Sequence, residues 1–160
     1  MPIKTGDTMP EGVLVEMTAD GPAPRTTADL FDGKKVVFFA LPGAFTPTCS
    51  AKHVPGYVEQ AVALKEKGID AVYCMSVNDA FVMGAWGKDQ KAGDAVTMLA
   101  DGNCAYTKAL DLVMDGTAFG MGMRSQRFAL VVDNGVVTEA CVEAPGDFKV
   151  SSAEHILSLL

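Results

Sequence analysis

One cysteine of this sequence lies where a thiol would be reactive. Cys49 ends a loop, residues 41–49, that follows a short apolar run and precedes an amphipathic segment. The loop is therefore expected beyond the carboxyl end of a strand, where open α/β sheets bind ligands. Thr46 and Pro47 are typical of an N-cap and a first helical residue, which puts Cys49 in the first helical turn. The free N–H groups of that turn favour an anion, and the thiolate is the nucleophilic form of cysteine. The alternative is a small buried hydrophobic residue.

Short apolar runs rich in β-branched and aromatic residues predict the strands that position this loop. The central strands are expected at residues 36–41, 71–77 and 128–132. Asn134 and Gly135 follow the third run, and this pair is a strong signal for a hairpin turn. The segment after the turn is therefore expected to pair antiparallel with the third strand.

Apolar residues at three- and four-residue spacing predict a helix between the first two strands, from about Val54 to a stop at Gly68. Three more helices are expected, at about residues 80–90, near residues 106–110, and from a capping box of Ser151 and Glu154 to Leu160. The order of strands and helices indicates a mixed α/β fold. No repeat or linker divides the sequence, so we expect one domain over residues 1–160.

The composition limits the compartment and the kinds of partner. A chain of 160 residues, 49% hydrophobic and 21% charged, is long enough to fold without disulfides or a structural metal. Its net charge of −7 and scattered basic residues argue against binding to nucleic acid or anionic membranes, and its apolar runs are far shorter than the ~20 residues that span a bilayer. The four cysteines form no C-x-x-C pair, and the first residues lack the apolar core of a secretory signal. We therefore expect a reducing, cytoplasmic compartment and no metal or cofactor.

The loop that ends at Cys49 resembles the active-site signature of peroxiredoxins, in the form found in the type II, or peroxiredoxin-five-like, subfamily. The resemblance rests on Pro42-x-x-x-Thr46-x-x-Cys49, on residues 74–82, and on Arg127 followed by Phe128. These segments lie across nearly the whole chain. The resemblance implies a thioredoxin-like fold, with a central mixed β-sheet flanked by helices.

The same resemblance implies thiol-dependent reduction of hydrogen peroxide and alkyl hydroperoxides, with Cys49 as the nucleophile. At the matching positions, Thr46 would hydrogen-bond the peroxide and the sulfur, Pro42 would shield the site from water, and Arg127 would polarise the peroxide. Arg124 is the poorer match for this arginine. Attack by sulfur on one oxygen expels hydroxide or alkoxide, so a guanidinium and backbone N–H groups suit the developing negative charge. The product would be a sulfenic acid at Cys49.

The sequence departs from many animal members of the subfamily, which carry a resolving cysteine near the C-terminal helix. Residues 147–154 contain no cysteine and resemble plant and bacterial type II members. This implies that an external thiol, from glutathione with glutaredoxin or from thioredoxin, reduces the sulfenic acid. Cys74 is expected to be structural because it lies in an apolar strand. Cys104, at an expected exposed turn, and Cys141 stay open as internal resolving cysteines.

His53 and Trp86 have two interpretations each. His53 follows Cys49 by one helical turn, so it could hold the thiolate as an imidazolium or hydrogen-bond the backbone near the active-site turn. Phe81 and Trp86 are expected in the core, and the alternative is an exposed Trp86 that anchors the homodimer implied by the resemblance.

Two other functions compete with the peroxidase. A peroxide sensor that relays oxidation to a partner protein through a mixed disulfide would need the same reactive Cys49. A non-catalytic thioredoxin-like interaction domain is disfavoured because Pro42, Thr46, Cys49 and Arg127 are all present.

Overall fold

A seven-stranded mixed β-sheet forms the centre of the computed structural model, which describes residues 1–160. Strands β3 (Lys35–Ala40), β4 (Ala71–Ser76) and β5 (Thr97–Ala100) are parallel, and β8 (Phe128–Asp133) pairs antiparallel with β3. The predicted bounds of β3, β4 and β8 agree with the structure within one residue. These three strands are buried on both faces, which explains their continuous apolar sequences.

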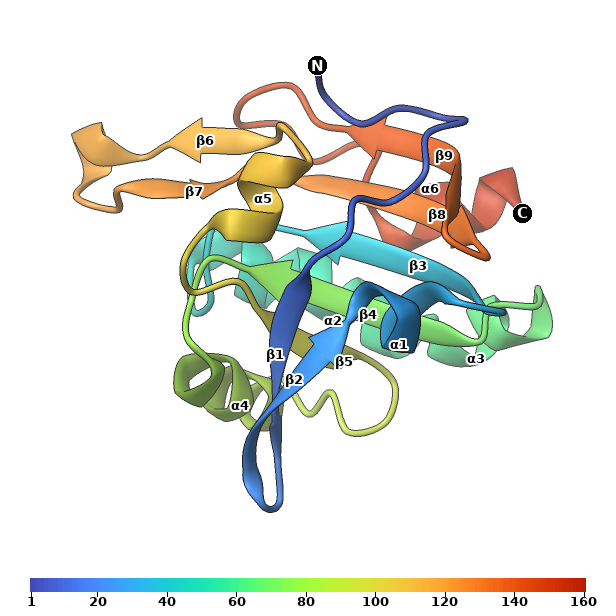
Figure 1. The fold of residues 1–160 in the computed structure, drawn as a ribbon, viewed down its shortest axis with the longest axis horizontal. Coiled ribbons are helices and arrows are strands. Elements are labelled where there is room, and N and C mark those ends of the chain that lie inside the picture. The colour runs from blue at the N-terminus through green and yellow to red at the C-terminus, as the bar shows by residue number, and fades with distance from the viewer.

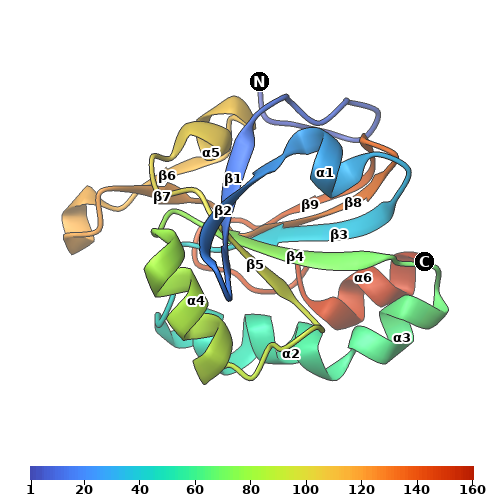
Figure 2. The same cartoon turned by 60° about the horizontal axis from the view of Figure 1, so that its bottom comes forward.

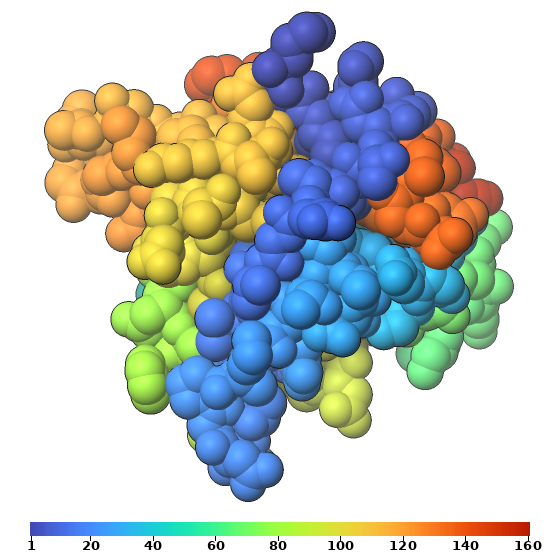
Figure 3. Space-filling model, viewed as in Figure 1, coloured from blue at the N-terminus to red at the C-terminus, as the bar shows by residue number.

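Three outer strands and one separate hairpin complete the β-structure. Strands β1 (Val13–Thr18), β2 (Gly21–Thr26) and β9 (Val136–Val142) extend the sheet in the order β2-β1-β5-β4-β3-β8-β9, and β6 (Val113–Asp115) pairs with β7 (Met123–Ser125). Two hairpins project from the body of the molecule: β1–β2, in blue at the bottom of Figures 1 and 3, and β6–β7, in yellow and orange at the left.

Helices cover both faces of the sheet (Figure 2). One face carries α2 (Val54–Glu59), α3 (Ala61–Glu66), α4 (Ala80–Asp89) and α6 (Ala153–Leu159), and the other carries α1 (Thr27–Phe31) and α5 (Ala105–Ala109). Side chains alternate along β3, so Val37 and Phe39 pack in the first core while Val36 and Phe38 pack in the second. The prediction of a central mixed sheet flanked by helices is confirmed. No helix is long and apolar enough to cross a membrane.

Two details of the predicted helices are wrong. The helix expected from Val54 to Gly68 is divided into α2 and α3 at Gln60, whose backbone leaves helical geometry at φ −94° and ψ 7°. The last helix is capped by Ser152, whose side chain accepts a hydrogen bond from His155 N. Ser151 does not cap this helix, because its hydroxyl is buried and donates a hydrogen bond to Glu143.

The predicted hairpin turn joins β8 to β9. Asn134 and Gly135 both have positive φ, 47° and 81°, as a tight turn of this handedness requires. The Asn134 side chain also accepts a hydrogen bond from Gly33 N at 2.7 Å, and its backbone N–H donates to Lys34 O at 2.8 Å. The turn therefore also holds the chain that leads into β3.

We expect Asn134→Ala to lower the free energy of unfolding by about 2 kcal/mol, measured by urea denaturation. Alanine is strained in the left-handed region by roughly 1–2 kcal/mol, and the bond to Gly33 contributes about 1 kcal/mol. Asn134→Gly keeps the backbone conformation and loses only the side-chain bond, so it should cost clearly less. Equal losses in the two variants would contradict the strain contribution.

Candidate active site

Cys49 lies at the start of the helix that follows β3. Helical backbone begins at Pro47, as predicted, with Thr46 immediately before it, and continues as a π-helical turn, Cys49–His53, that leads into α2. The prediction that Cys49 lies in the first turn is therefore confirmed. Its side chain is fully buried in the core between the sheet and the helices α2, α4 and α6. The thiol is thus held inside the protein and depends on protein groups for its hydrogen bonds.

Arg127 provides one such group. Its Nη2 donates to Cys49 Sγ at 3.1 Å, although 78 residues separate the two in sequence. The contact follows from the sheet: β3 and β8 are antiparallel neighbours with Ala40 opposite Phe128, so the residue before β8 meets the loop after β3. The guanidinium also lies 5.8 Å from the ring centre of Phe148, within cation–π range.

His53 holds the other side of this guanidinium. Arg127 Nη1 lies 2.7 Å from His53 Nδ1, and His53 Nε2 lies 3.0 Å from the carbonyl oxygen of Ser151. An arginine can only donate, so Nδ1 accepts and Nε2 carries the proton that is donated to Ser151. Burial lowers the pKa of His53 to about 3, the charge of Arg127 acts in the same direction, and the bond to Ser151 opposes both. The imidazolium interpretation is wrong. His53 does hydrogen-bond a backbone carbonyl, as expected, but the carbonyl belongs to Ser151 and not to the active-site turn.

Thr46 and Pro42 belong to the same loop as Cys49. The Thr46 hydroxyl donates to Gly43 O at 2.7 Å, and no hydrogen bond joins it to the sulfur. Its lone pairs are thus left to accept from another molecule. Pro42 is partly exposed, and its carbonyl oxygen accepts from Arg124 Nη1 at 3.5 Å. Arg124 thus binds the loop backbone, while Arg127 contacts the sulfur.

Asn78 anchors the loop to the sheet, a contact that was not predicted. Its side-chain oxygen accepts from Ala44 N at 3.0 Å and from the Ser76 hydroxyl at 2.6 Å, at the end of β4. Its only sequence signal is its place directly after a buried strand, a position where Asn and Asp also commonly cap the next helix. That role falls to Asp79, whose side chain accepts from Val82 N at 2.8 Å.

Trp86 anchors the helix that carries the thiol. It is fully buried, and its Nε1 donates to Ser50 Oγ at 3.0 Å. The prediction of a core Trp86 is confirmed, and an exposed dimer anchor at this position is ruled out. Phe81, on the same helix α4, is 69% exposed, so its predicted burial is wrong.

The three other thiols are buried and unpaired. Cys74 lies in β4 and Cys141 in β9. Cys104, expected at an exposed turn, is only 5% exposed, because the left-handed N-cap of α5 turns it inward. Burial raises the pKa of Cys104 and of Cys141, and that of Cys74 more strongly. All three thiols are therefore poorly ionised.

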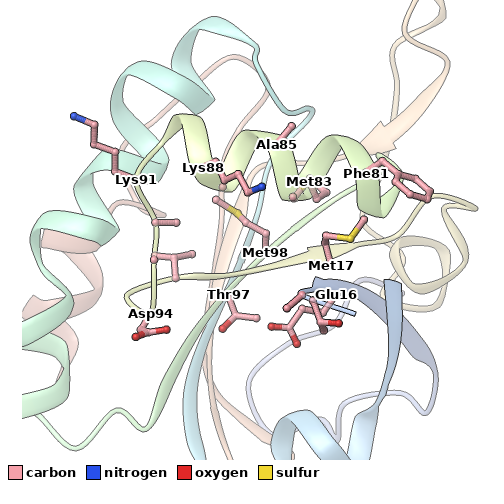
Figure 4. A pocket seen from close by; sticks show the side chains of 17 residues that line it. Glu16, Met17, Phe81, Met83, Ala85, Lys88, Lys91, Asp94, Thr97 and Met98 are labelled. Carbon is pink, nitrogen blue, oxygen red and sulfur yellow. The ribbon is translucent and has the colours of Figure 1, made fainter. Parts of the chain in front are cut away.

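A separate groove of about 1000 Å³ lies between α4 and strands β1 and β5. Figure 4 shows Met17 and Met98 between the helix and the strands, Lys88 on the helix, and Asp94 on the loop that leads into β5. Its lining contains no cysteine, histidine or arginine. The groove therefore offers none of the chemistry gathered around Cys49. Nowhere do three or more His, Cys, Asp or Glu side chains lie together as metal ligands.

Comparisons with known proteins agree with this geometry. The family model described as Redoxin matches residues 4–157. Peroxiredoxin-2B of Arabidopsis thaliana is 48% identical over 160 residues, 99% of each chain. Among solved structures, reduced Prx3 of Vibrio vulnificus in complex with hydrogen peroxide is 53% identical over 98% of each chain, with a TM-score of 0.95. The Plasmodium falciparum antioxidant protein, a 1-Cys peroxiredoxin, is 30% identical over 98% of each chain, with a TM-score of 0.90.

The likeness extends over the entire fold, and the expected thioredoxin-like architecture is confirmed. It extends also to the sequence, since a relative that matches over 99% of both chains is 48% identical. The chain belongs to the redoxin family and, within it, to the peroxiredoxins, which are thiol-dependent peroxidases.

Proposed function

We propose that Cys49 is the nucleophile with which this peroxiredoxin reduces hydrogen peroxide and alkyl hydroperoxides. The proposal rests on one observation above all: Cys49 Sγ accepts a hydrogen bond from the Arg127 guanidinium at 3.1 Å. The thiolate attacks one peroxide oxygen, an S–O bond forms and the O–O bond breaks. The attacked oxygen keeps its hydrogen as Cys49 sulfenic acid, and the expelled alkoxide or hydroxide takes a proton to leave as alcohol or water.

The negative charge moves from sulfur to the leaving oxygen during this step, and Arg127 is placed to stabilise it throughout. A charged donor in a site without water acts more strongly than the same donor in solution. Thr46 would accept the hydrogen of the attacked oxygen, because its own hydrogen is directed to Gly43. Pro42 would limit access of water to the thiol.

We further propose that an external thiol completes the cycle. One thiol condenses with the sulfenic acid, forming a mixed disulfide and water, and a second thiol displaces Cys49 from that disulfide. Glutathione with glutaredoxin, or thioredoxin, would supply these thiols. Supporting this view, Cys104 and Cys141 are buried and have raised pKa values, so neither is a ready internal partner.

A homodimer and a cytoplasmic location complete the proposal. Phe45, Phe81 and Phe119 are 54%, 69% and 81% exposed, and exposed apolar side chains that gather into one patch mark interaction surfaces. Phe45 belongs to the active-site loop, so a second copy that covers these rings would lie beside the site. Four unpaired thiols favour a reducing compartment.

Replacement of the nucleophile should abolish turnover. We expect Cys49→Ser to lower hydrogen peroxide consumption, with dithiothreitol as reductant, by roughly a thousandfold or more. Cys141→Ser is the control: it should retain turnover, since an external thiol resolves the intermediate. Activity that survives in Cys49→Ser would refute the assignment. Stoichiometric oxidation of Cys49 in the wild type without turnover would favour the sensor.

Arg127→Gln should lower the second-order rate with peroxide by about a hundredfold, as removal of one charged donor from a site of developing negative charge does, and this loss of rate should be far larger than the loss of folding stability. Arg25→Gln is the matched control, because Arg25 is ion-paired with Glu16 on the β1–β2 hairpin and should keep its rate. Similar rates for Arg127→Gln and wild type, measured by stopped flow, would remove Arg127 from the mechanism.

The lowered pKa of His53 predicts a pH dependence of stability. Between pH 6.5 and about pH 3, His53 binds a proton in the unfolded chain but not in the folded protein, because folding lowers its pKa from 6.5 to about 3. The free energy of unfolding therefore falls as the pH falls through this range. Urea unfolding at several pH values gives the slope of the free energy of unfolding against pH. His53→Gln should reduce this slope by the contribution of up to one proton, about 1.4 kcal/mol per pH unit. Parallel curves for wild type and His53→Gln would rule out the neutral His53.

A further inference from the structure

Glu143 is a buried carboxylate that the proposed reaction does not use. It is 7% exposed and lies directly after β9. A single oxygen, Oε2, accepts from the backbone N–H groups of Lys149, Val150 and Ser151 at 2.8, 2.9 and 2.8 Å and from the Ser151 hydroxyl at 2.7 Å. Burial raises the pKa of Glu143, but these hydrogen bonds outweigh it and the pKa lies below its ordinary value. The charged carboxylate therefore holds this segment without a cationic partner.

Ser151 transmits this restraint to its own carbonyl oxygen. While its N–H and hydroxyl bind Glu143, its carbonyl oxygen accepts from Tyr57 OH at 2.7 Å and from His53 Nε2 at 3.0 Å. The residue is fully buried, so no water competes for these bonds. The position of the carbonyl oxygen determines which nitrogen of His53 carries the proton.

The same chain of bonds continues to the thiol. With its proton on Nε2, His53 accepts from Arg127 through Nδ1 at 2.7 Å, and the other arm of the guanidinium donates to Cys49 Sγ at 3.1 Å. Glu143 also holds Arg127 directly through the backbone, since Glu143 N donates to Arg127 O at 3.0 Å. Side-chain and main-chain contacts of one residue thus converge on the guanidinium.

We infer that Glu143 is a positioning residue for the peroxidase reaction, acting through Ser151 and His53 to orient Arg127 toward Cys49. The inference deepens the proposed function and rests on it. If the Ser151 carbonyl is displaced, His53 loses the acceptor that fixes its tautomer, and Arg127 loses an acceptor that fixes its rotamer. The guanidinium then spends less time against the sulfur, and both the ionised thiol and the leaving oxygen are less stabilised.

The structure also contains a second buried, hydrogen-bonded carboxylate, which is not connected to Arg127 through its side chain. Asp101 is 4% exposed, and its oxygens accept from Tyr106 N, Thr107 N and Thr107 Oγ1 at 3.1, 2.8 and 2.7 Å. It therefore holds the start of α5 much as Glu143 holds the segment before α6, but its side-chain bonds end there. Asp101→Asn thus controls for the loss of a buried, hydrogen-bonded carboxylate.

The test compares Glu143→Gln with Asp101→Asn in the full chain. Both should lower the melting temperature, because a neutral amide oxygen accepts these hydrogen bonds more weakly. Only Glu143→Gln should lower the second-order rate with hydrogen peroxide, by about tenfold. Rates are normalised to the amount of free Cys49 thiol in each sample. It should also move the pH profile of Cys49 alkylation by iodoacetamide to higher pH, as followed by mass spectrometry of the Cys49 peptide. The titratable and charged groups around this thiol are Arg127, which contacts the sulfur, His53, which contacts Arg127, and Cys74, and all three are retained.

Ser151→Ala provides a second route if Glu143→Gln does not fold. It removes the hydroxyl bond to Glu143 and keeps the carbonyl, so a smaller effect in the same direction is expected, and Glu143→Asp should retain more activity than Glu143→Gln. The inference is overturned if Glu143→Gln, or Ser151→Ala in its place, matches Asp101→Asn in rate and alkylation profile. A wild-type protein without Cys49-dependent turnover would instead overturn the proposed function itself.

Discussion

The contact between the Arg127 guanidinium and the Cys49 sulfur is the interaction on which the rest of the site depends. A thiolate in a protein core is costly unless a donor compensates for the water it has lost, and one charged donor lies 3.1 Å away. Local sequence predicted the place of Cys49 in the first helical turn, but it could not predict that Arg127 contacts the sulfur. Antiparallel pairing of β3 with β8 brings the loop after one strand to the start of the other, with Ala40 opposite Phe128. The topology of the sheet is therefore a requirement of the chemistry.

The apolar surroundings of the site determine its charges. Phe39 stacks on Tyr57 with ring centres 4.0 Å apart and lies 4.8 Å from the His53 ring. In this environment His53 is neutral, since its pKa falls to about 3, and burial keeps Cys74 protonated by raising its pKa. Arg127 thus provides positive charge beside the sulfur without competition from a second titrating cation. The same low dielectric strengthens its interaction with any charge that forms there.

Local patterns predicted the central strands, the Asn-Gly turn and the helix start at Pro47, because each depends on neighbouring residues. They did not predict β2, whose Pro22 and Pro24 argue against a strand; prolines are tolerated there because β2 is at the edge of the sheet. The roles of Asn78 and Glu143 depend on partners distant in sequence, so no local signal could assign them. Cys104 was misplaced because a polar turn sequence does not reveal that its left-handed cap points inward.

The π-helical turn has a consequence for how this sequence can vary. In Cys49–His53 the N–H of Val54 bonds to the carbonyl of Cys49, five residues back, so the turn contains one residue more than an α-helical turn. Each residue rotates a helix by about 100°. A deletion or insertion within this turn would therefore swing either the thiol or the imidazole away from the arginine between them. Evolution can exchange side chains along the turn, but its length is fixed by the need to present two residues to one guanidinium.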